Sequence, residues 1–281
     1  MNFIKLISKW PKLVWHYIKI SRSFDFMLRY IILWLLYLLN SLFFGKLEKI
    51  IGRMHPMFYK TFVFKTSFWT YLWKTVNHRT VLDPDYEPAL RKIINQNYKK
   101  NHDQERIFVD IWAHIWRYAV ELTKNYWYKT YAFEPSPETY KILKSNTILS
   151  GIESDIQVFN YALWDKEAEM FFDYREDNDA SSKIIQNPTN KEKAIKVPVR
   201  IFDNLLSEID SKKVRLIIMD VEWFEYQVLQ GMTSFFQKAW DFDFIIEIMD
   251  DQERRLETIE FMHKLWFQSK KIDRDNYHFW K

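Results

Sequence analysis

Six short apolar runs, separated by stretches with helical periodicity, constrain the fold of this chain more than any other feature. The runs are rich in the β-branched and aromatic residues that strands favour, and helical patterns cover residues 137–149 and 224–238. The strand-like runs lie at residues 107–111, 129–133, 156–160, 196–201, 216–221 and 244–248. This alternation predicts an α/β fold with a mostly parallel sheet, helices on both faces, and ligands bound at the carboxyl ends of the strands.

Composition narrows the classes of function. The 281 residues suffice for one large domain with an extra segment, and we predict a division into residues 1–60 and 61–281. The absence of cysteine excludes disulfides, thiolate metal sites and cysteine nucleophiles. We predict no metal cofactor. A net charge of +4 is too small on a chain of this length to indicate nucleic acid as a partner.

The first 60 residues contain an apolar run with basic flanks. Residues 26–44 are almost wholly apolar, and at ~1.5 Å per residue such a helix just spans a hydrocarbon core of ~30 Å. Residues 3–20 alternate apolar and basic positions, as in helices that lie on anionic membranes. The segment predicts contact with a membrane surface. The apolar run itself has three interpretations: an interfacial or re-entrant helix, a spanning helix, or a buried helix of a soluble domain.

Glycine is scarce in this chain and tryptophan is abundant. The chain holds 4 glycines, where average usage of about 7% predicts roughly 20, and it holds 13 tryptophans. Several tryptophans stand just after a predicted strand, where a tight turn favours small residues. The segments that follow three of the strands are DIWAHIW (residues 110–116), FEPSP (133–137) and DVEWFE (220–225).

With glycine in place of Trp112, Trp116 and Trp223, these segments resemble the FkbM-type family of S-adenosylmethionine-dependent methyltransferases. The resemblance covers residues 80–281 and includes YALWDKEAE (161–169), VRIFDNLL (199–206), VLQGM (228–232) and FIIEI (244–248). It implies a Rossmann-like class I methyltransferase sheet, preceded here by an N-terminal apolar helical segment. It also implies S-adenosylmethionine as cofactor and O-methylation of a hydroxyl. We expect the acceptor to be a small molecule or glycan, such as a sugar or a lipid-linked glycan.

The resemblance and the chemistry of the side chains assign a cofactor-binding set. Asp110 is expected near the cofactor's ammonium, with turn capping as the alternative role. Glu134 ends the second strand, where a carboxylate accepts hydrogen bonds from both ribose hydroxyls. The predicted cofactor-binding residues are Asp110, Trp112, Ala113, Trp116, Glu134, Pro135, Ser136, Ala162, Leu163 and Asp220.

Three residues are candidates for catalysis: Asp220, Glu222 and His114. Two neighbouring carboxylates at a strand end can differ in pKa, which leaves one as a base for an acceptor hydroxyl. The alternative role for this pair is loop scaffolding with cofactor contact, and for His114 it is packing or hydrogen bonding. Weaker candidates are Glu225, Glu247, Ser181 and Ser182.

The tryptophans that replace motif glycines suggest a single cause. We predict that UGA codons, read as tryptophan in this sequence, are glycine codons in the source cell. The clear cases are Trp112, Trp116, Trp164 and Trp223, and further ones are Trp127, Trp240 and Trp266. The alternative is that these tryptophans are real, in which case Trp112 fills the cofactor's space and the chain binds S-adenosylmethionine poorly.

Two other classes of function stay open at this point. One is a non-catalytic scaffold with a methyltransferase fold and a plugged pocket. The other is a membrane-associated glycosyltransferase that uses Asp83-Pro84-Asp85 or Asp241-Phe242-Asp243 to hold a metal and a nucleotide sugar. Because the cofactor is cytosolic, a methyltransferase is expected at the cytoplasmic face of a membrane, peripheral or N-terminally anchored, or else in the cytoplasm.

Overall fold

The structure is a computed structural model that describes residues 28, 31, 32, 35, 62–65, 70–73, 87–115, 117–174, 182–185, 195–249 and 252–281. The chain divides into two compact units, Met1–Pro84 and Asp85–Lys281. The first unit holds a hairpin of β1 (Phe62–Lys65) and β2 (Thr70–Trp73). Most of the predicted N-terminal membrane segment lies outside the described residues. Among the described residues of this unit and of the rest of the chain, no helix is long and apolar enough to cross a membrane.

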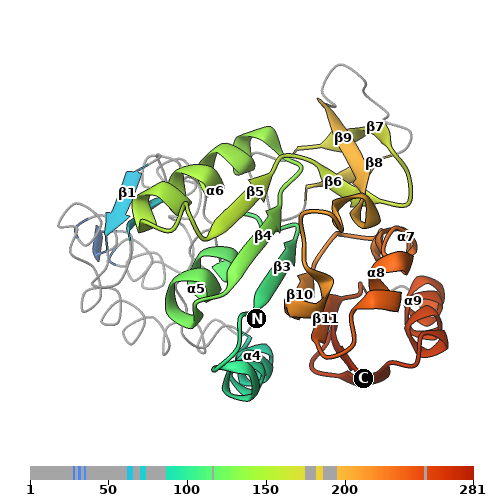
Figure 1. Ribbon diagram of the computed structural model, residues 1–281. Helices are drawn as coiled ribbons and strands as arrows, with labels where there is room; N and C mark the ends of the chain where they lie inside the picture. The colour runs from blue at the N-terminus through green and yellow to red at the C-terminus, as the bar shows by residue number, and fades with distance from the viewer. Residues whose placement is uncertain are drawn as a thin grey trace. The chain divides into compact units, whose positions relative to one another are not determined.

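A seven-stranded sheet forms the centre of the second unit (Figure 1). Its order is β12-β13-β11-β10-β3-β4-β5. The bounds are β3 (Ile107–Ile111), β4 (Lys129–Phe133), β5 (Ile156–Phe159), β10 (Val214–Met219), β11 (Asp243–Glu247), β12 (Gln268–Lys271) and β13 (Asn276–Trp280). The strands from β11 to β5 are parallel, whereas β13 runs antiparallel to both its neighbours. The predicted α/β fold with a mostly parallel sheet is confirmed.

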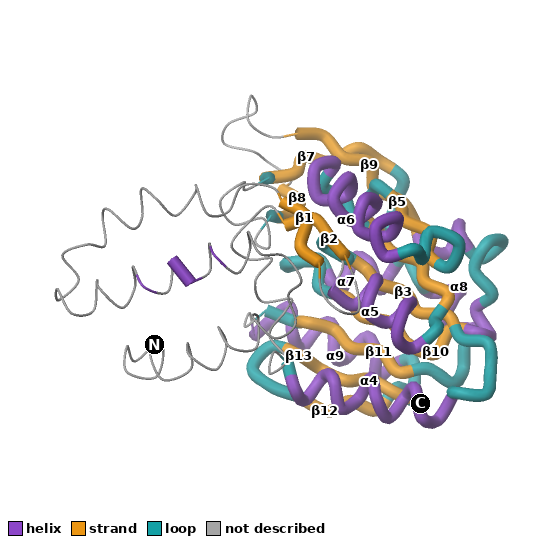
Figure 2. The backbone as a smooth tube through the Cα atoms, turned by 90° about the vertical axis from the view of Figure 1, so that its left-hand side faces the viewer, coloured by secondary structure: helices purple, strands orange, loops and turns teal. Residues whose placement is uncertain are grey.

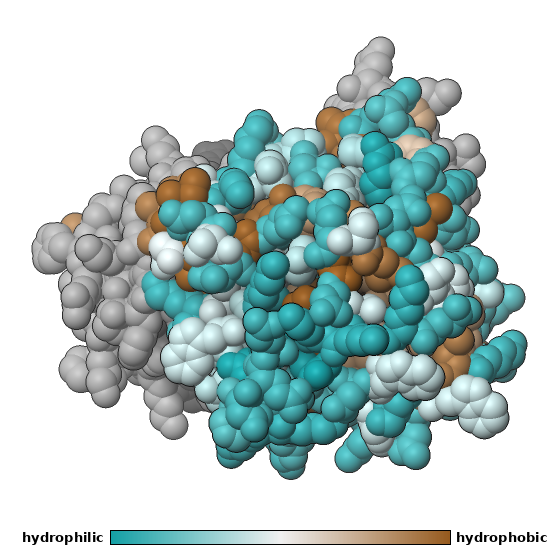
Figure 3. Space-filling view, in the orientation of Figure 1, coloured by the Kyte–Doolittle hydropathy of each residue, from teal (hydrophilic) through white to brown (hydrophobic). Residues whose placement is uncertain are grey.

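Helices cover both faces of this sheet, as Figures 1 and 2 show. On one face Leu90 and Leu122 pack against Phe108 and Leu216, and on the other Phe235 belongs to a larger apolar cluster. The helices are α4 (Pro88–Asn101), α5 (Arg117–Tyr126), α6 (Pro137–Ser150), α7 (Glu225–Gln230), α8 (Thr233–Lys238) and α9 (Gln252–Lys264). Alternate residues of each central strand therefore enter different cores. The outer face seen in Figure 3 is largely hydrophilic, with hydrophobic residues in separate patches.

A second sheet departs from the sequence prediction. Its order is β6-β9-β7-β8, formed by Ala162–Trp164, Ile195–Ile201, Ala168–Asp173 and Lys183–Ile185. Residues 196–201 were expected in the parallel sheet, but β9 pairs antiparallel with β7 and parallel with β6. Within the polar stretch 175–193, residues 183–185 form β8, which pairs antiparallel with β7. Strand β8 has only three residues, too few for a sequence window to detect a period of two.

The predicted helix at residues 224–238 is two helices, α7 and α8, which Gly231 and Met232 separate. Gly231 is required here by a close approach. A Cβ at this position would lie 2.2 Å from the carbonyl oxygen of Trp164 in β6 and 3.0 Å from its carbonyl carbon. Backbone atoms cannot rotate away as the end of a side chain can, so the close contact requires glycine. The break between α7 and α8 lies at this contact with β6.

Substitution of Gly231 by alanine should therefore destabilise the fold. We expect Gly231→Ala to lower the free energy of unfolding by about 1–3 kcal/mol, the usual cost of overpacking. Urea denaturation of the full chain measures this change. The exposed Gln237 of α8 provides a control, since Gln237→Ala should change stability by less than about 0.5 kcal/mol. Equal effects of the two substitutions would contradict the close approach.

Candidate active site

Three turns meet at the carboxyl edge of the central sheet, after β3, β4 and β10. Strand β3 lies between β4 and β10, so the strand order reverses here. The N–H groups of Trp112 and Ala113 both donate to the carbonyl oxygen of Phe133, at 2.8 and 2.9 Å, and the N–H of Asp220 donates to Ile111 at 3.2 Å. Open parallel sheets bind their ligands at such a reversal point. The predicted location of the site is thus a real junction of turns.

Glu134 ties two of these turns together. Its side chain is buried, and its Oε2 accepts a hydrogen bond from the N–H of His114 at 2.9 Å, while Oε1 accepts one from the N–H of Ser136 at 2.8 Å. Asn160 donates to the Glu134 carbonyl oxygen at 2.9 Å and fixes the backbone. The carboxylate is therefore held in one orientation by backbone groups, and its oxygens are acceptors of the kind that the predicted ribose contact requires.

Asp110 offers a buried carboxyl oxygen at the end of β3. The side chain is 3% exposed, and its Oδ2 has no hydrogen-bond partner among the described residues. Burial raises the pKa of Asp110 to about 8; the N–H of Ala119 and the His114 ring lower it, whereas the charge of Glu134 raises it. A buried acceptor without a partner is costly. A cofactor's ammonium group would supply that partner, so Asp110 fits the predicted role.

Trp112 places a bulky side chain beside the turn after β3. Its backbone is left-handed, with a φ of 77°, and its half-buried indole packs 5.8 Å from the ring of Phe172 in β7. The rings of Trp164 and Phe224, 4.6 Å apart, belong to the same aromatic group. The indole therefore fills space between the turn after β3 and the second sheet. Two carboxylates at this edge suit S-adenosylmethionine, and the bulky side chain beside them does not.

Four carboxyl groups gather where β10 and β11 end. Asp220, Glu222 and Glu225 follow β10, and Glu247 ends the adjacent strand. Burial raises the pKa of Asp220, and the charges of Glu247 and Glu222 raise it further. Burial also raises the pKa of Glu222, and brings Glu225 and Glu247 to about 7. Burial and mutual repulsion thus raise the pKa of all four carboxyls above the ordinary range, as is common for groups that transfer protons.

Glu87 joins this group from outside the sequence motifs. It stands just before α4 with a φ of 48°, and it accepts a hydrogen bond from the Tyr118 hydroxyl. Its charge raises the pKa of both Asp220 and Glu247. No short motif contains Glu87, so the sequence alone could not identify it. Only the fold brings these distant segments together.

Two cations also lie near the turn after β10. The Nζ of Lys183 is 5.6 Å and the Cζ of Arg254 is 5.5 Å from the ring centre of Trp223. Arg254 also donates to the Trp223 carbonyl oxygen at 3.1 Å. The positive charge of Lys183 lowers the pKa of Glu222 against the effect of burial. Charges of both signs therefore border the carboxylates.

The other predicted site residues take more structural positions. His114 has a φ of 53°, and Ser136 caps α6 by accepting a hydrogen bond from the N–H of Thr139 at 3.3 Å. Buried residues at or near this edge are Ala113, Pro135, Ala162, Leu163 and Ser182. Ala162 and Leu163 lie in β6, and each belongs to an apolar cluster of the core. Trp116 and Ser181 lie outside the described residues.

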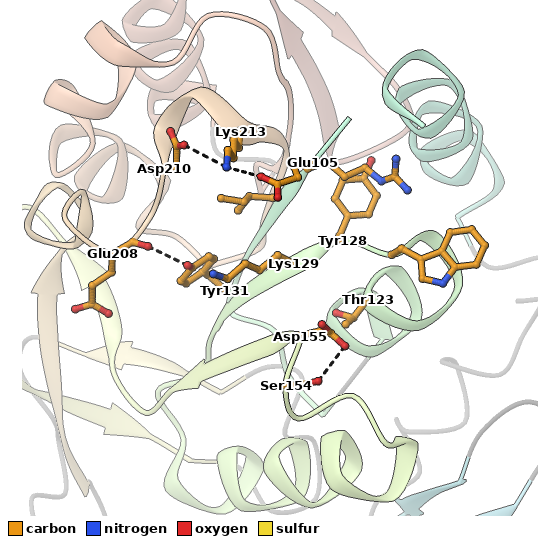
Figure 4. Close-up of a pocket in the computed structure, with 13 residues that line it drawn as sticks. Glu105, Thr123, Tyr128, Lys129, Tyr131, Ser154, Asp155, Glu208, Asp210 and Lys213 are labelled. Atoms are coloured by element: carbon orange, nitrogen blue, oxygen red, sulfur yellow. Dashed lines mark hydrogen bonds and ion pairs between the residues drawn. The ribbon is translucent and has the colours of Figure 1, made fainter. Parts of the chain in front are cut away.

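A cavity of about 520 Å³ lies at the opposite edge of the sheet, beside the amino ends of β3 and β4 (Figure 4). Lys213 pairs there with Glu105 and, at 3.8 Å, with Asp210. None of the predicted cofactor or catalytic residues lines this cavity. Parallel sheets of this type bind ligands at the carboxyl edge. The cavity is therefore distinct from the candidate site.

Residues 241–243, the second motif considered for a glycosyltransferase, are also at the amino edge, where β11 begins. Asp241 pairs with Lys100 at 2.5 Å, and Asp243 accepts hydrogen bonds from Asn97 at 2.6 Å and pairs with His278 at 2.7 Å. These carboxylates already have partners, so nothing here supports a glycosyltransferase. The motif Asp83-Pro84-Asp85 lies outside the described residues.

Comparison with known proteins gives a family. Residues 96–271 match the family model of the methyltransferase FkbM domain. No curated protein matches the chain. Similar solved structures include a precorrin-6y C5,15-methyltransferase from Geobacter metallireducens GS-15, with 8% identity, a TM-score of 0.39, and coverage of 68% of this chain and 88% of that one.

Two further structures are similar to this chain at comparable levels. A human methyltransferase 10 domain containing protein has 9% identity and a TM-score of 0.41, with coverage of 70% of this chain and 82% of that one. TYW2 of M. jannaschii, solved in complex with AdoMet, has 14% identity and a TM-score of 0.38, with coverage of 78% and 83%.

The carboxylate of Glu134 gives a test of the cofactor position. In a Trp112→Gly background, which removes the neighbouring indole, Glu134→Gln should weaken S-adenosylmethionine binding about 10- to 100-fold, because it removes charge-assisted hydrogen bonds worth ~1.5–3 kcal/mol. Calorimetric titration measures the change. Adenosine should lose affinity likewise and adenine should not, since adenine lacks the ribose. A similar loss for adenine would show a general disturbance of the site instead.

The raised pKa of Glu225 predicts a pH-dependent stability. Its folded value of about 7 lies above its ordinary value of 4.5, so the unfolded chain holds fewer protons in that window and stability falls as pH rises through it. Glu225→Gln removes the titrating carboxyl. The difference in the free energy of unfolding between pH 5 and pH 8 should therefore shrink by up to about 3 kcal/mol. Urea unfolding at both pH values measures it. An unchanged pH dependence would contradict the burial of this carboxyl.

Proposed function

The chain belongs to the methyltransferase FkbM family, and we propose that it methylates a hydroxyl oxygen of a sugar, glycan or lipid-linked acceptor. S-adenosylmethionine is the cofactor of this methyltransferase. When bound, it supplies a methyl group on a sulfonium, which is already a strong electrophile. The protein then has to hold two substrates in line and remove one proton. The observation that carries the proposal is the group of carboxyls beside the cofactor residues.

The proton of the acceptor hydroxyl would pass to a carboxylate after β10. Asp220 and Glu222 stand at the end of the strand adjacent to β3, which carries Asp110. Their raised pKa values make their ionised forms stronger bases than exposed carboxylates. Carboxylates also accept hydrogen bonds from hydroxyl groups, so a polyhydroxylated acceptor suits this edge better than an apolar one. The methyl–oxygen bond would form as the methyl–sulfur bond of the sulfonium breaks, S-adenosylhomocysteine would be the leaving group, and the carboxylate would keep the hydroxyl proton.

The N-terminal residues support the lipid-linked part of the proposal. Residues 1–60 combine a basic, amphipathic stretch with an apolar run, which suits a segment that lies on an anionic membrane. We place the enzyme at the cytoplasmic face, where its cofactor is made. Full-length protein should sediment with phosphatidylglycerol vesicles and be released by salt. Absence of binding at low salt would remove the membrane from the proposal.

Radiolabelled methyl transfer tests the acceptor class. The full chain with Trp112→Gly and Trp223→Gly is incubated with methyl-labelled S-adenosylmethionine and a glycolipid extract. We expect label in the extract as a methyl ether, which resists mild alkali. Label released as methanol by alkali would indicate a carboxyl ester, and label on an amine would indicate N-methylation. Either result would overturn the proposed acceptor while leaving the methyltransferase intact.

The two carboxylates can be separated in the same assay. Asp220→Asn and Glu222→Gln keep the shape of the side chain and remove the base, so the one that takes the proton should lower kcat about 10²- to 10⁴-fold. The Kd for S-adenosylmethionine should change little in Glu222→Gln. Glu208→Gln, an exposed carboxylate at the other edge, serves as control. Full activity in both site variants would rule out this pair as the base.

One observation favours a second function for the chain as written. Trp112 and Trp223 stand in the turns that border the site, and such rings would leave a methyltransferase fold without an open cofactor pocket. A non-catalytic scaffold would then be the result. Calorimetric titration of the unsubstituted full chain with S-adenosylmethionine distinguishes a methyltransferase from a scaffold, because a scaffold with a filled pocket binds no cofactor.

A further inference from the structure

Tryptophan occupies a backbone conformation in this protein that bulky residues avoid. Among the described residues, seven that are not glycine have a positive φ, and four of these are Trp112, Trp127, Trp223 and Trp266. Tryptophan is 13 of the 281 residues, so fewer than one of seven would be expected by composition. Left-handed backbone is open to glycine, tolerated by asparagine and aspartate, and strained for larger side chains. The coincidence therefore needs a cause.

Two helix ends allow a direct comparison. After α6, Gly151 has a φ of 65°; its N–H donates to Ile148 at 3.0 Å, and the next N–H donates to Thr147 at 3.2 Å. After α9, Trp266 has a φ of 69°; its N–H donates to His263 at 2.9 Å, and the next N–H donates to Met262 at 3.1 Å. Both ends have the Schellman pattern, in which the left-handed residue is usually glycine. The same backbone thus holds glycine once and tryptophan once.

The tryptophans at helix ends have almost no packing to justify them. Trp266 is 87% exposed and Trp127, directly after α5, is 71% exposed. A side chain of this size is rarely so exposed. Neither ring therefore gains from burial what its backbone loses to strain. Glycine at these two positions would remove both the strain and the exposed apolar surface.

The same conformation occurs in two of the three turns that form the candidate site, those after β3 and β10. Trp112 follows β3 with a φ of 77°, and Trp223 precedes α7 with a φ of 92°. Without these indoles, the space beside Phe172 would open, and Lys183 and Arg254 would no longer lie over a ring. Helix ends and site turns are unrelated in function. What they share is the backbone angle.

We propose that the source cell inserts glycine at positions 112, 127, 223 and 266, by reading UGA codons as glycine. The codon UGG for tryptophan differs from UGA in one base, so one difference in decoding replaces glycine by tryptophan wherever UGA occurs. This accounts for the left-handed tryptophans, for their exposure at helix ends, and for part of the shortage of glycine in a chain that holds only 4. It also opens the cofactor edge of the sheet. The identity of the residues does not depend on the proposed acceptor.

A stability comparison tests the backbone argument without any substrate. In the full chain, Trp266→Gly should raise the thermal midpoint by about 2–4 °C. Trp266→Ala removes the same ring and keeps a Cβ, so it should give little of this gain. Gly151→Trp, the reverse change in the matching motif, should lower the midpoint. Equal midpoints for the alanine and glycine variants would overturn the argument, because the ring and not the backbone would then matter.

The residues themselves are identified by mass spectrometry of the protein from its source cells. Trypsin releases residues 107–117, which contain position 112, and residues 125–129, which contain position 127. We expect the fragment spectra of the two peptides to show glycine at positions 112 and 127. We expect the gene to carry UGA at these two codons. Peptides with tryptophan, or UGG codons, would overturn the proposal. Neither outcome depends on which acceptor is methylated. Failure of the glycine proposal can therefore be distinguished from failure of the O-methylation proposal.

Discussion

The chain has to turn away from β3 directly beside β4, and the rest of the site depends on that turn. The N–H groups of Trp112 and Ala113 share the carbonyl oxygen of Phe133, and the N–H of His114 reaches the carboxylate of Glu134. So tight a path requires left-handed backbone at residues 112 and 114. Glycine meets this requirement without strain. The cofactor edge is therefore shaped by main-chain geometry before any side chain takes part.

Electrostatics then divides the edge into two parts. Near β3 and β4, Glu134 is held by two backbone N–H groups, an arrangement that suits neutral hydroxyls or a cation as ligands. After β10 and β11, carboxyls crowd one another, and burial raises the pKa of Glu225 and Glu247 to about 7. The first part suits a cofactor and the second suits proton transfer. In the proposed function, neighbouring strand ends would therefore hold the methyl donor and receive the acceptor's proton.

The sequence predicted the elements whose signals are local. Strands β3 and β4 have the predicted bounds, because buried parallel strands are continuous apolar runs. The second sheet escaped prediction, since β8 is three residues long within a polar stretch. Among the candidate residues, the sequence singled out Asp110 and Glu134 because each lies at the carboxyl end of a strand. Glu87, Lys183 and Arg254 could not, because they reach the site from segments far apart in sequence. The predicted membrane segment and domain boundary stay predictions.

The tryptophans show how sequence and structure inform each other. The sequence singled out four tryptophans in family motifs and three more at turns or element ends, and of the six that the structure describes four have a positive φ. Trp164 is different, because it lies in strand β6, where its carbonyl group approaches Gly231. Trp240 is 69% exposed but is not left-handed. The backbone angle thus supports glycine at particular positions and not at every candidate.

A crystal structure with S-adenosylhomocysteine, for the full chain carrying glycine at positions 112 and 223, tests the central claim most directly. The account predicts the ribose hydroxyls within hydrogen-bond distance of the Glu134 carboxylate and the ammonium group beside Asp110. The carboxyls of Asp220 and Glu222 should border the sulfur. A ligand bound elsewhere, such as in the cavity beside Glu105 and Lys213, would contradict it.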